Sequence, residues 1–218
     1  MSSTETDTRT GHDARLGFRH RFRPATRPGR PPLLLLHGTG GDEDDLLPLG
    51  EAAAPGSALL SPRGQVLENG MPRFFRRLAE GVFDEADLRH RTDELAAFIR
   101  GAREAYGLEA PVALGFSNGA NIAAALLLRH PGLLRGAVLL RAMQPFREEE
   151  PVPPPGLAGT PVLLLSGTAD PIVPAANSEG LAARLRQAGA EVTYHPLPAG
   201  HGLSQMDLSL ARSWLAGL

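Results

Sequence analysis

Short runs of consecutive apolar residues, separated by stretches with helical spacing, constrain the fold of this chain most strongly. The runs are LLLL (33–36), SALLS (57–61), VALGF (112–116), GAVLL (136–140) and VLLLS (162–166). A strand whose every residue is apolar needs cover on both faces, which is typical of the central strands of a parallel sheet. Strands that alternate with helices therefore predict an α/β fold, with a mostly parallel sheet inside three αβα layers.

Two further strands are expected at the sides of this sheet. In residues 16–23, apolar side chains and His20 alternate with arginines, a period of two that is typical of a half-exposed edge strand. The segment EVTYHPL (191–197) is a more polar last strand, which brings the expected total to about seven. Helices are expected along the stripe from Leu88 to Tyr106, over 121–130, over 175–189 and at the C-terminus.

The length of 218 residues suits one α/β domain. Residues 1–13 are polar and are expected to form a disordered tail, and residues 14–218 are expected to form the single domain. The segment REEEPVPPPGLAG (147–159) is interpreted as a proline-rich loop. No long insertion indicates a large lid, so an open cleft is expected.

Charge and cysteine content exclude several classes of protein. Lys+Arg 22 against Asp+Glu 24 gives a net charge of −2 without a basic stripe, so no nucleic-acid partner is expected. The densest basic patch, RFFRR (73–77), is interpreted as a solvated helix face. The absence of cysteine excludes disulfides and a cysteine nucleophile and fits a reducing cytoplasm, where we expect the protein. We find no signal-peptide pattern and no membrane-spanning apolar stretch.

The segment GFSNG (115–119) fits the pattern G-x-S-x-G in the context that gives it meaning. It follows the apolar strand 112–116 and precedes a helix that opens near Asn118. A strand–turn–helix of this kind is a nucleophile elbow, which exposes its serine in front of helix N-terminal amides. The alternative is an ordinary glycine-rich turn, because the five-residue pattern is common. Ser117 is the candidate nucleophile.

A serine nucleophile needs a general base, and the base needs an acid to orient it. In this architecture the acid and then the histidine follow the serine, each after a strand. Asp170 lies four residues beyond the strand that ends at Ser166, and His201 lies between the last strand and the last helix. Of the seven histidines, only His37 competes, and it precedes the serine. For the acid, Asp207 is out of order and Glu179 is a weak fallback.

The segment LLLLHGTGGDEDD (33–45) can be a phosphate loop, an oxyanion hole or a simple turn. Its acids would repel a phosphate, no lysine follows its glycines, and Glu43 breaks a dinucleotide-binding pattern. We expect these acids in the first turn of the next helix, with Asp42 as its cap, in preference to a metal site. The amide of Thr39 then remains as an oxyanion donor, and the amide of Asn118 is the second.

On these segments the chain resembles the α/β-hydrolase superfamily and, within it, the phospholipase/carboxylesterase family that includes acyl-protein thioesterases. The resemblance rests on blocks such as GFSNGANIAAALLLRHP, SGTADPIVP and GHGLS and covers nearly everything after residue 30. It is nearest to the bacterial carboxylesterase branch. The resemblance implies an enzyme that needs no cofactor or metal and acts on a small-molecule ester.

The expected reaction is ester hydrolysis through an acyl-enzyme on Ser117, with His201 as the base and Asp170 as its orienting acid. Candidate pocket residues are Met71, Phe74, Phe75, Met143 and Arg63, and Arg73 is a second arginine that could meet an anionic substrate. Thioesterase, lysophospholipase and C–C bond hydrolase activities stay open as alternatives, as does a non-catalytic binding protein. The sequence also leaves open whether the chain forms a homodimer.

Overall fold

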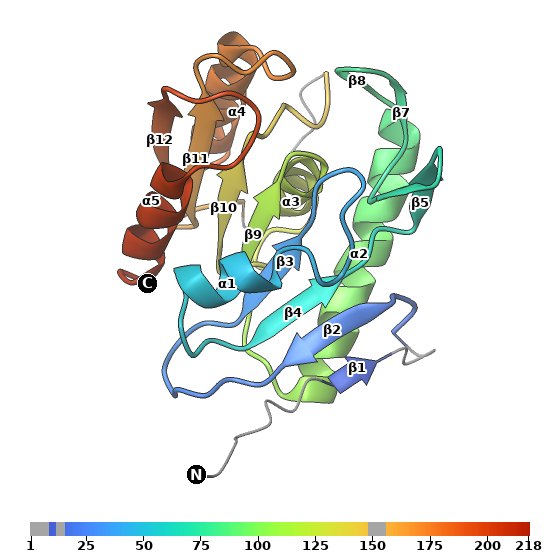
Figure 1. Cartoon of the computed structure of the whole chain (residues 1–218), viewed down its shortest axis with the longest axis vertical. Helices are drawn as coiled ribbons and strands as arrows, with labels where there is room; N and C mark the ends of the chain where they lie inside the picture. The colour runs from blue at the N-terminus through green and yellow to red at the C-terminus, as the bar shows by residue number, and fades with distance from the viewer. Residues whose placement is uncertain (1–8, 12–15, 148–155) are drawn as a thin grey trace.

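The computed structural model describes residues 9–11, 16–147 and 156–218. Its main sheet has eight strands in the order β1-β2-β4-β3-β9-β10-β11-β12 (Figure 1). All neighbouring strands from β4 to β12 pair in parallel, whereas β1 and β2 are antiparallel additions at one side. The strands are β1 (Arg9–Gly11), β2 (His20–Arg23), β3 (Leu33–Leu36), β4 (Leu59–Pro62), β9 (Val112–Phe116), β10 (Gly136–Leu140), β11 (Pro161–Gly167) and β12 (Glu191–Leu197).

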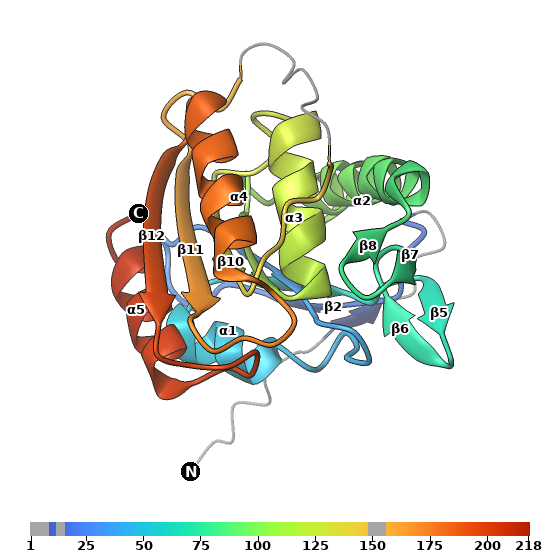
Figure 2. The same cartoon turned by 90° about the horizontal axis from the view of Figure 1, so that it is seen from above.

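Helices cover both faces of the sheet and complete the three expected layers. Figure 2 shows α2, α3 and α4 on one face and α1 and α5 on the other. Their bounds are α1 (Leu47–Ala53), α2 (Glu85–Tyr106), α3 (Asn118–Arg129), α4 (Ala175–Gln187) and α5 (Gln205–Leu215). No helix in the described part of the chain is long and apolar enough to cross a membrane.

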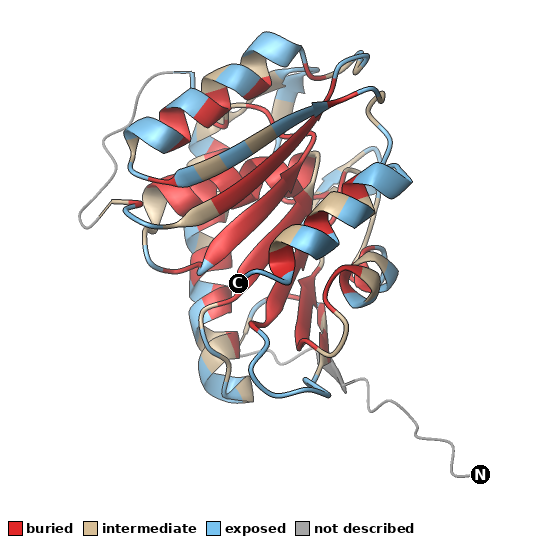
Figure 3. Cartoon of the chain, turned by 90° about the vertical axis from the view of Figure 1, so that its left-hand side faces the viewer, coloured by how far each residue is buried: buried red, intermediate tan, exposed pale blue. Residues whose placement is uncertain are grey.

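The apolar runs divide their side chains between two cores. Leu34 and Leu36 pack with α2, α3 and α4, whereas Leu33 and Leu35 pack with α1 and α5. Alternate side chains of a strand point to opposite faces, so an all-apolar run serves both cores. The central strands are accordingly buried along their length (Figure 3). Each buried leucine contributes roughly 1.5–3 kcal/mol relative to an exposed one.

The N-terminal segment differs from the expectation. Residues 9–11, expected in a disordered tail, form β1 and pair with β2, which raises the strand count from seven to eight. The strand expected over 16–23 is only the four residues of β2, and it is not at the edge because β1 covers it. Residues 1–8 and 12–15, and residues 148–155 of the proline-rich loop, lie outside the described residues.

The expectation of a helix face at residues 73–77 is wrong. Two hairpins occupy this part of the chain, β5 (Val66–Glu68) with β6 (Met71–Arg73) and β7 (Arg77–Ala79) with β8 (Val82–Phe83). Asn69 and Gly70 both have positive φ at the first turn, the geometry that an Asn-Gly hairpin turn requires. That dipeptide was the sequence signal for a hairpin here.

Candidate active site

Ser117 lies at a strained turn between β9 and α3. Its φ of 51° is in a region that residues other than glycine rarely occupy. The two glycines of the motif permit this turn. A Cβ on Gly115 would lie 2.6 Å from the carbonyl oxygen of Gly119, and a Cβ on Gly119 would overlap the carbonyl oxygen of Leu36. The backbone strain of about 1–3 kcal/mol is therefore held in place by close packing of the elbow on β3.

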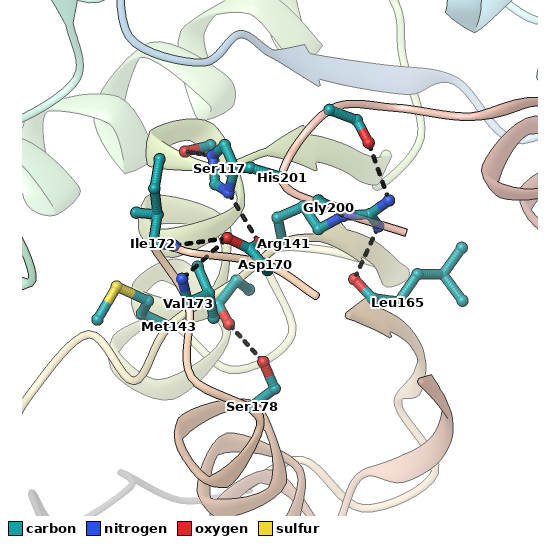
Figure 4. Close-up of polar contacts among 12 residues, drawn as sticks. Ser117, Arg141, Met143, Leu165, Asp170, Ile172, Val173, Ser178, Gly200 and His201 are labelled. Carbon is teal, nitrogen blue, oxygen red and sulfur yellow. Dashed lines mark hydrogen bonds and ion pairs between the residues drawn. The ribbon is translucent and has the colours of Figure 1, made fainter. Parts of the chain in front are cut away.

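The structure brings Ser117, His201 and Asp170 into one hydrogen-bonded chain, although 84 and 31 residues separate the bonded pairs (Figure 4). Nε2 of His201 lies 2.9 Å from Oγ of Ser117, and Nδ1 lies 2.8 Å from Oδ2 of Asp170. Asp170 follows β11 and His201 follows β12, so both loops leave the carboxyl ends of parallel strands. This shared edge also carries the elbow after β9.

The surroundings of Asp170 decide its charge. Burial of the carboxyl raises its pKa, but the backbone amides of Ile172 and Val173 and the ring of His201 lower it further, so the pKa lies below its usual value. The two amides donate to Oδ1 at 2.8 and 3.0 Å. An ionised carboxylate can only accept hydrogen bonds. The proton of the neutral imidazole is therefore on Nδ1, and Nε2 is left to accept a hydrogen bond from Ser117.

Ser117 and His201 line a cavity with a volume of about 300 Å³. The two candidate oxyanion donors, Thr39 and Asn118, line the same cavity. Among the described residues, the backbone amides of Thr39 and Asn118 donate to no acceptor. The side chain of Asn118 has a separate task, because its Oδ1 accepts the amide of Phe74 at 2.8 Å. The backbone amides of Thr39 and Asn118 are thus free to donate to an anionic oxygen.

Among the described residues, Met143 and Arg73 are the predicted substrate-contacting residues that line this cavity. Phe74 and Phe75 are buried in the core under the hairpins. Met71 is exposed on β6, and Arg63 pairs with Asp42 and Glu43. The apolar walls are instead Phe83, Phe116, Met143, Ile172 and Val173.

The acids after Gly41 are not in the first turn of a helix, so that expectation is wrong: the N-cap of α1 is Leu46, and Asp42 instead caps the preceding turn by accepting the amide of Asp44 at 2.9 Å. Residues 43–46 form this turn before α1, and Glu43 is completely buried between Arg19 and Arg63. Asp44 binds Arg21 through contacts of 2.7 and 2.9 Å. Arginine pairing, which sequence spacing does not reveal, accounts for Asp42, Glu43 and Asp44.

His37, the competing histidine, has a structural role in the loops beside the site. Its Nδ1 donates to the carbonyl of Gly38 at 2.7 Å, and its Nε2 accepts the amide of Gly64 at 2.9 Å. Burial lowers the pKa of this histidine, which favours the neutral ring that both bonds need. His37 thereby ties the turn that carries Thr39 to the loop after β4.

Sequence reasoning missed Arg141, the residue that anchors the His201 loop. Its side chain is completely buried, and its guanidinium binds the carbonyls of Gly200 at 2.9 Å and Gly202 at 3.1 Å, on either side of His201. It also makes two contacts with Asp207, at 2.7 and 2.9 Å. A longer contact reaches the carbonyl of Leu165, and Figure 4 shows it together with the contact to Gly200. A lone arginine directly after an all-apolar strand was the available signal.

The parallel sheet, the strained elbow and the cavity at the carboxyl edge of the strands together define an α/β-hydrolase. Residues 22–217 match the model of the phospholipase/carboxylesterase family, and the chain belongs to this family of hydrolases. This confirms the resemblance found in the sequence.

Individual relatives agree with this assignment. The chain is 49% identical to MhqD of Bacillus subtilis (strain 168) over 184 residues, which are 84% of this chain and 90% of that protein. The crystal structure of the Bacillus cereus carboxylesterase is 48% identical, with a TM-score of 0.88 and coverage of 92% and 94% of the two chains. A carboxylesterase structure from Mesorhizobium loti is 35% identical, with a TM-score of 0.88 and coverage of 97% and 99%.

Proposed function

We propose that the protein is a carboxylesterase that works through an acyl-enzyme on Ser117. The observation that carries this proposal is the hydrogen-bonded chain from Asp170 through His201 to Ser117 at the wall of a cavity. Similarity to the carboxylesterases of Bacillus cereus and Mesorhizobium loti supports the ester class.

In the first half of the reaction, Nε2 of His201 takes the proton of Ser117 as the serine oxygen attacks the ester carbonyl. The carbonyl oxygen becomes an anion, which the amides of Thr39 and Asn118 stabilise by about 3 kcal/mol for each donor. His201 then donates its proton to the leaving alcohol, and the acyl group stays on Ser117. Asp170 remains ionised throughout and stabilises the imidazolium that forms.

In the second half, water replaces the alcohol and His201 removes one of its protons. The resulting oxyanion collapses, the bond to Ser117 breaks and the serine recovers its proton from His201. The products are a carboxylic acid and the free enzyme. The cycle needs no cofactor, because each proton that is moved returns to a group of the chain or leaves with a product.

The test is hydrolysis of p-nitrophenyl acetate and butyrate by the Ser117→Ala variant. We expect kcat to fall by at least 10³-fold while the thermal unfolding temperature stays close to that of the parent. Ser57→Ala is the matched control, because the Ser57 hydroxyl is buried without a hydrogen-bond partner among the described residues and does not line the cavity. Full activity of Ser117→Ala would refute the proposal.

Two further measurements define the reaction class. A fluorophosphonate probe is expected to label the parent protein and to leave Ser117→Ala unlabelled. A binding protein without a reactive serine would not be labelled in either form. A panel of esters, thioesters, lysophospholipids and ring-fission diketones then compares the reactions open to this fold. We expect the highest kcat/KM on a carboxylic ester.

A further inference from the structure

The hairpin side of the cavity carries two guanidinium groups that share a single carboxylate. Nη1 of Arg73 lies 3.1 Å from one oxygen of Glu68, and Nε of Arg77 lies 2.9 Å from the other. Both arginines line the cavity that contains Ser117, whereas Glu68 does not. The cluster of these three residues therefore has a net charge of +1, and the positive groups are the ones that face the cavity.

Both arginines retain N–H groups that no described residue accepts. Arg73 uses Nε for the carbonyl of Phe75 and Nη1 for Thr39 and Glu68, which leaves Nη2 without an acceptor. Arg77 donates only through Nε, to Glu68, so both of its terminal nitrogens lack an acceptor among the described residues. The side chain of Arg73 is 4% exposed, and a buried charged donor without a full set of partners favours a bound anion.

The other charged groups at the cavity do not offset this cluster. The donors of Arg141 are occupied by Asp207 and by backbone carbonyls, so Arg141 offers no further N–H groups to a ligand. Glu80 is exposed to solvent, which screens its charge. Arg73 and Arg77 are thus the cavity residues with cationic donors available to a ligand.

The cluster adjoins the proposed reacting centre. Nη1 of Arg73 donates to Oγ1 of Thr39 at 2.7 Å, and the amide of the same Thr39 is the proposed oxyanion donor. Phe83 and Met143 border the space near the hairpins and give it apolar walls. An anionic group held by Arg77 and Arg73 would therefore be joined to the ester carbonyl through a short apolar spacer.

We propose that the natural substrate is an ester that carries a free carboxylate close to the scissile bond, and that Arg77 and Arg73 bind this carboxylate. The inference rests on the proposed esterase function and adds its substrate class. Guanidinium groups pair with carboxylates through two parallel hydrogen bonds, which suits a pair of arginines with unused N–H groups.

The test compares each anionic ester with a neutral one of nearly the same shape. For the acyl half, the pair is mono-4-nitrophenyl succinate and its methyl ester. For the alcohol half, the pair is 4-acetoxybenzoate and methyl 4-acetoxybenzoate. Rates without enzyme are subtracted, and the ratio of kcat/KM within each pair is the measured quantity. We expect the anionic ester to be preferred at least tenfold in one pair, which identifies the half that carries the carboxylate.

Three variants link that preference to the cluster. Arg77→Gln is expected to lower the ratio at least tenfold, mainly by raising KM for the anionic ester, and to leave the neutral ester nearly unaffected. Glu68→Gln is expected to raise the ratio, because it removes the carboxylate that both arginines share. Arg76→Gln is the matched control, since Arg76 is exposed, pairs with Asp84 and does not line the cavity. Its ratio is expected to equal that of the parent.

Equal kcat/KM within both pairs would overturn the proposal, and so would a preference that survives Arg77→Gln. In that case, Ser117-dependent hydrolysis of the neutral esters would still support the proposed esterase function. If no ester is hydrolysed, calorimetric titration of the Ser117→Ala variant with monomethyl succinate and dimethyl succinate gives an independent readout. The subsite is supported if monomethyl succinate binds, dimethyl succinate does not, and the Ser117→Ala, Arg77→Gln double variant no longer binds monomethyl succinate. No binding of monomethyl succinate to Ser117→Ala overturns it.

Discussion

Asp207→Asn tests whether the buried pair with Arg141 holds the His201 loop in place. The substitution keeps the size of the side chain and removes its charge. The Arg141 and Asp207 side chains are 0% and 1% exposed, and the two contacts between them are 2.7 and 2.9 Å. In the variant, the guanidinium charge stays buried, with backbone carbonyls and one amide oxygen as its remaining acceptors.

Removing one partner of a buried ion pair costs about 3–5 kcal/mol. We expect the lower end, about 3 kcal/mol, because the carbonyls of Gly200 and Gly202 still accept hydrogen bonds from Arg141. For a domain of this size, 1 kcal/mol corresponds to about 2–4 °C, so the unfolding temperature should fall by about 6–12 °C. Because the two carbonyls flank His201, we also expect a loss of activity in the folded variant. At assay temperatures below its unfolding transition, kcat on p-nitrophenyl butyrate should be about tenfold lower than in the parent.

The matched control is Asp93→Asn, which removes a surface carboxylate that contacts Nε and Nη2 of Arg129 and Nε2 of His130. Asp93 binds Arg129 at 3.0 and 3.2 Å, and its side chain is 48% exposed. Exposed pairs contribute about 0–1 kcal/mol, so this unfolding temperature should change by less than about 4 °C. Equal shifts in the two variants, or an unchanged kcat in Asp207→Asn, would refute the reasoning.

Acidity provides a second readout of the same pair. Burial raises the pKa of Asp207, but Arg141 and Ser204 lower it further, so the folded-state pKa lies below its usual value. The stabilisation is therefore complete above the unfolded-state pKa of about 3.9 and is lost as the pH falls through the folded-state pKa. The difference in stability between parent and Asp207→Asn should be constant at neutral pH and shrink below about pH 4.

Two further substitutions test the elbow and the orienting acid. Gly119→Ala places a Cβ against the carbonyl of Leu36, which is expected to lower the unfolding temperature strongly, whereas Gly202→Ala meets nothing within 4 Å and should change it little; similar values for both would contradict the packing argument. Asp170→Asn replaces the charged acceptor of the Nδ1 proton with a neutral amide, whose NH2 group favours the wrong tautomer of His201, and kcat is expected to fall by about 10⁴-fold with little change in KM. Steady-state kinetics of a p-nitrophenyl ester measure this effect, and a kcat within a factor of ten of the parent would exclude Asp170 as the orienting acid.

The apolar runs and the motif around Ser117 carried most of the predictable information. The strands 33–36, 112–116 and 136–140 coincide with the observed β3, β9 and β10, because an all-apolar run has few alternatives to a buried central strand. The chain order of Ser117, Asp170 and His201 was also readable, since each follows a strand whose carboxyl end lies at one edge of the sheet. The hairpins over 66–83 were missed because their strands are only two or three residues long.

By itself, the sequence determined the layered α/β architecture and the tight turn at residues 115–119, because hydrophobic burial and local turn geometry act over a few neighbouring positions. Only the tertiary structure decided which distant polar and charged groups meet. Asp207 lies 66 residues from Arg141, and Thr39 lies 34 residues from Arg73. No periodicity encodes such pairs, because each contact depends on where two separate loops or helices end in space. The charged cluster itself lies within residues 68–77, but only the fold places it beside Thr39 and Ser117, and the proposed preference for an anionic ester follows from that placement.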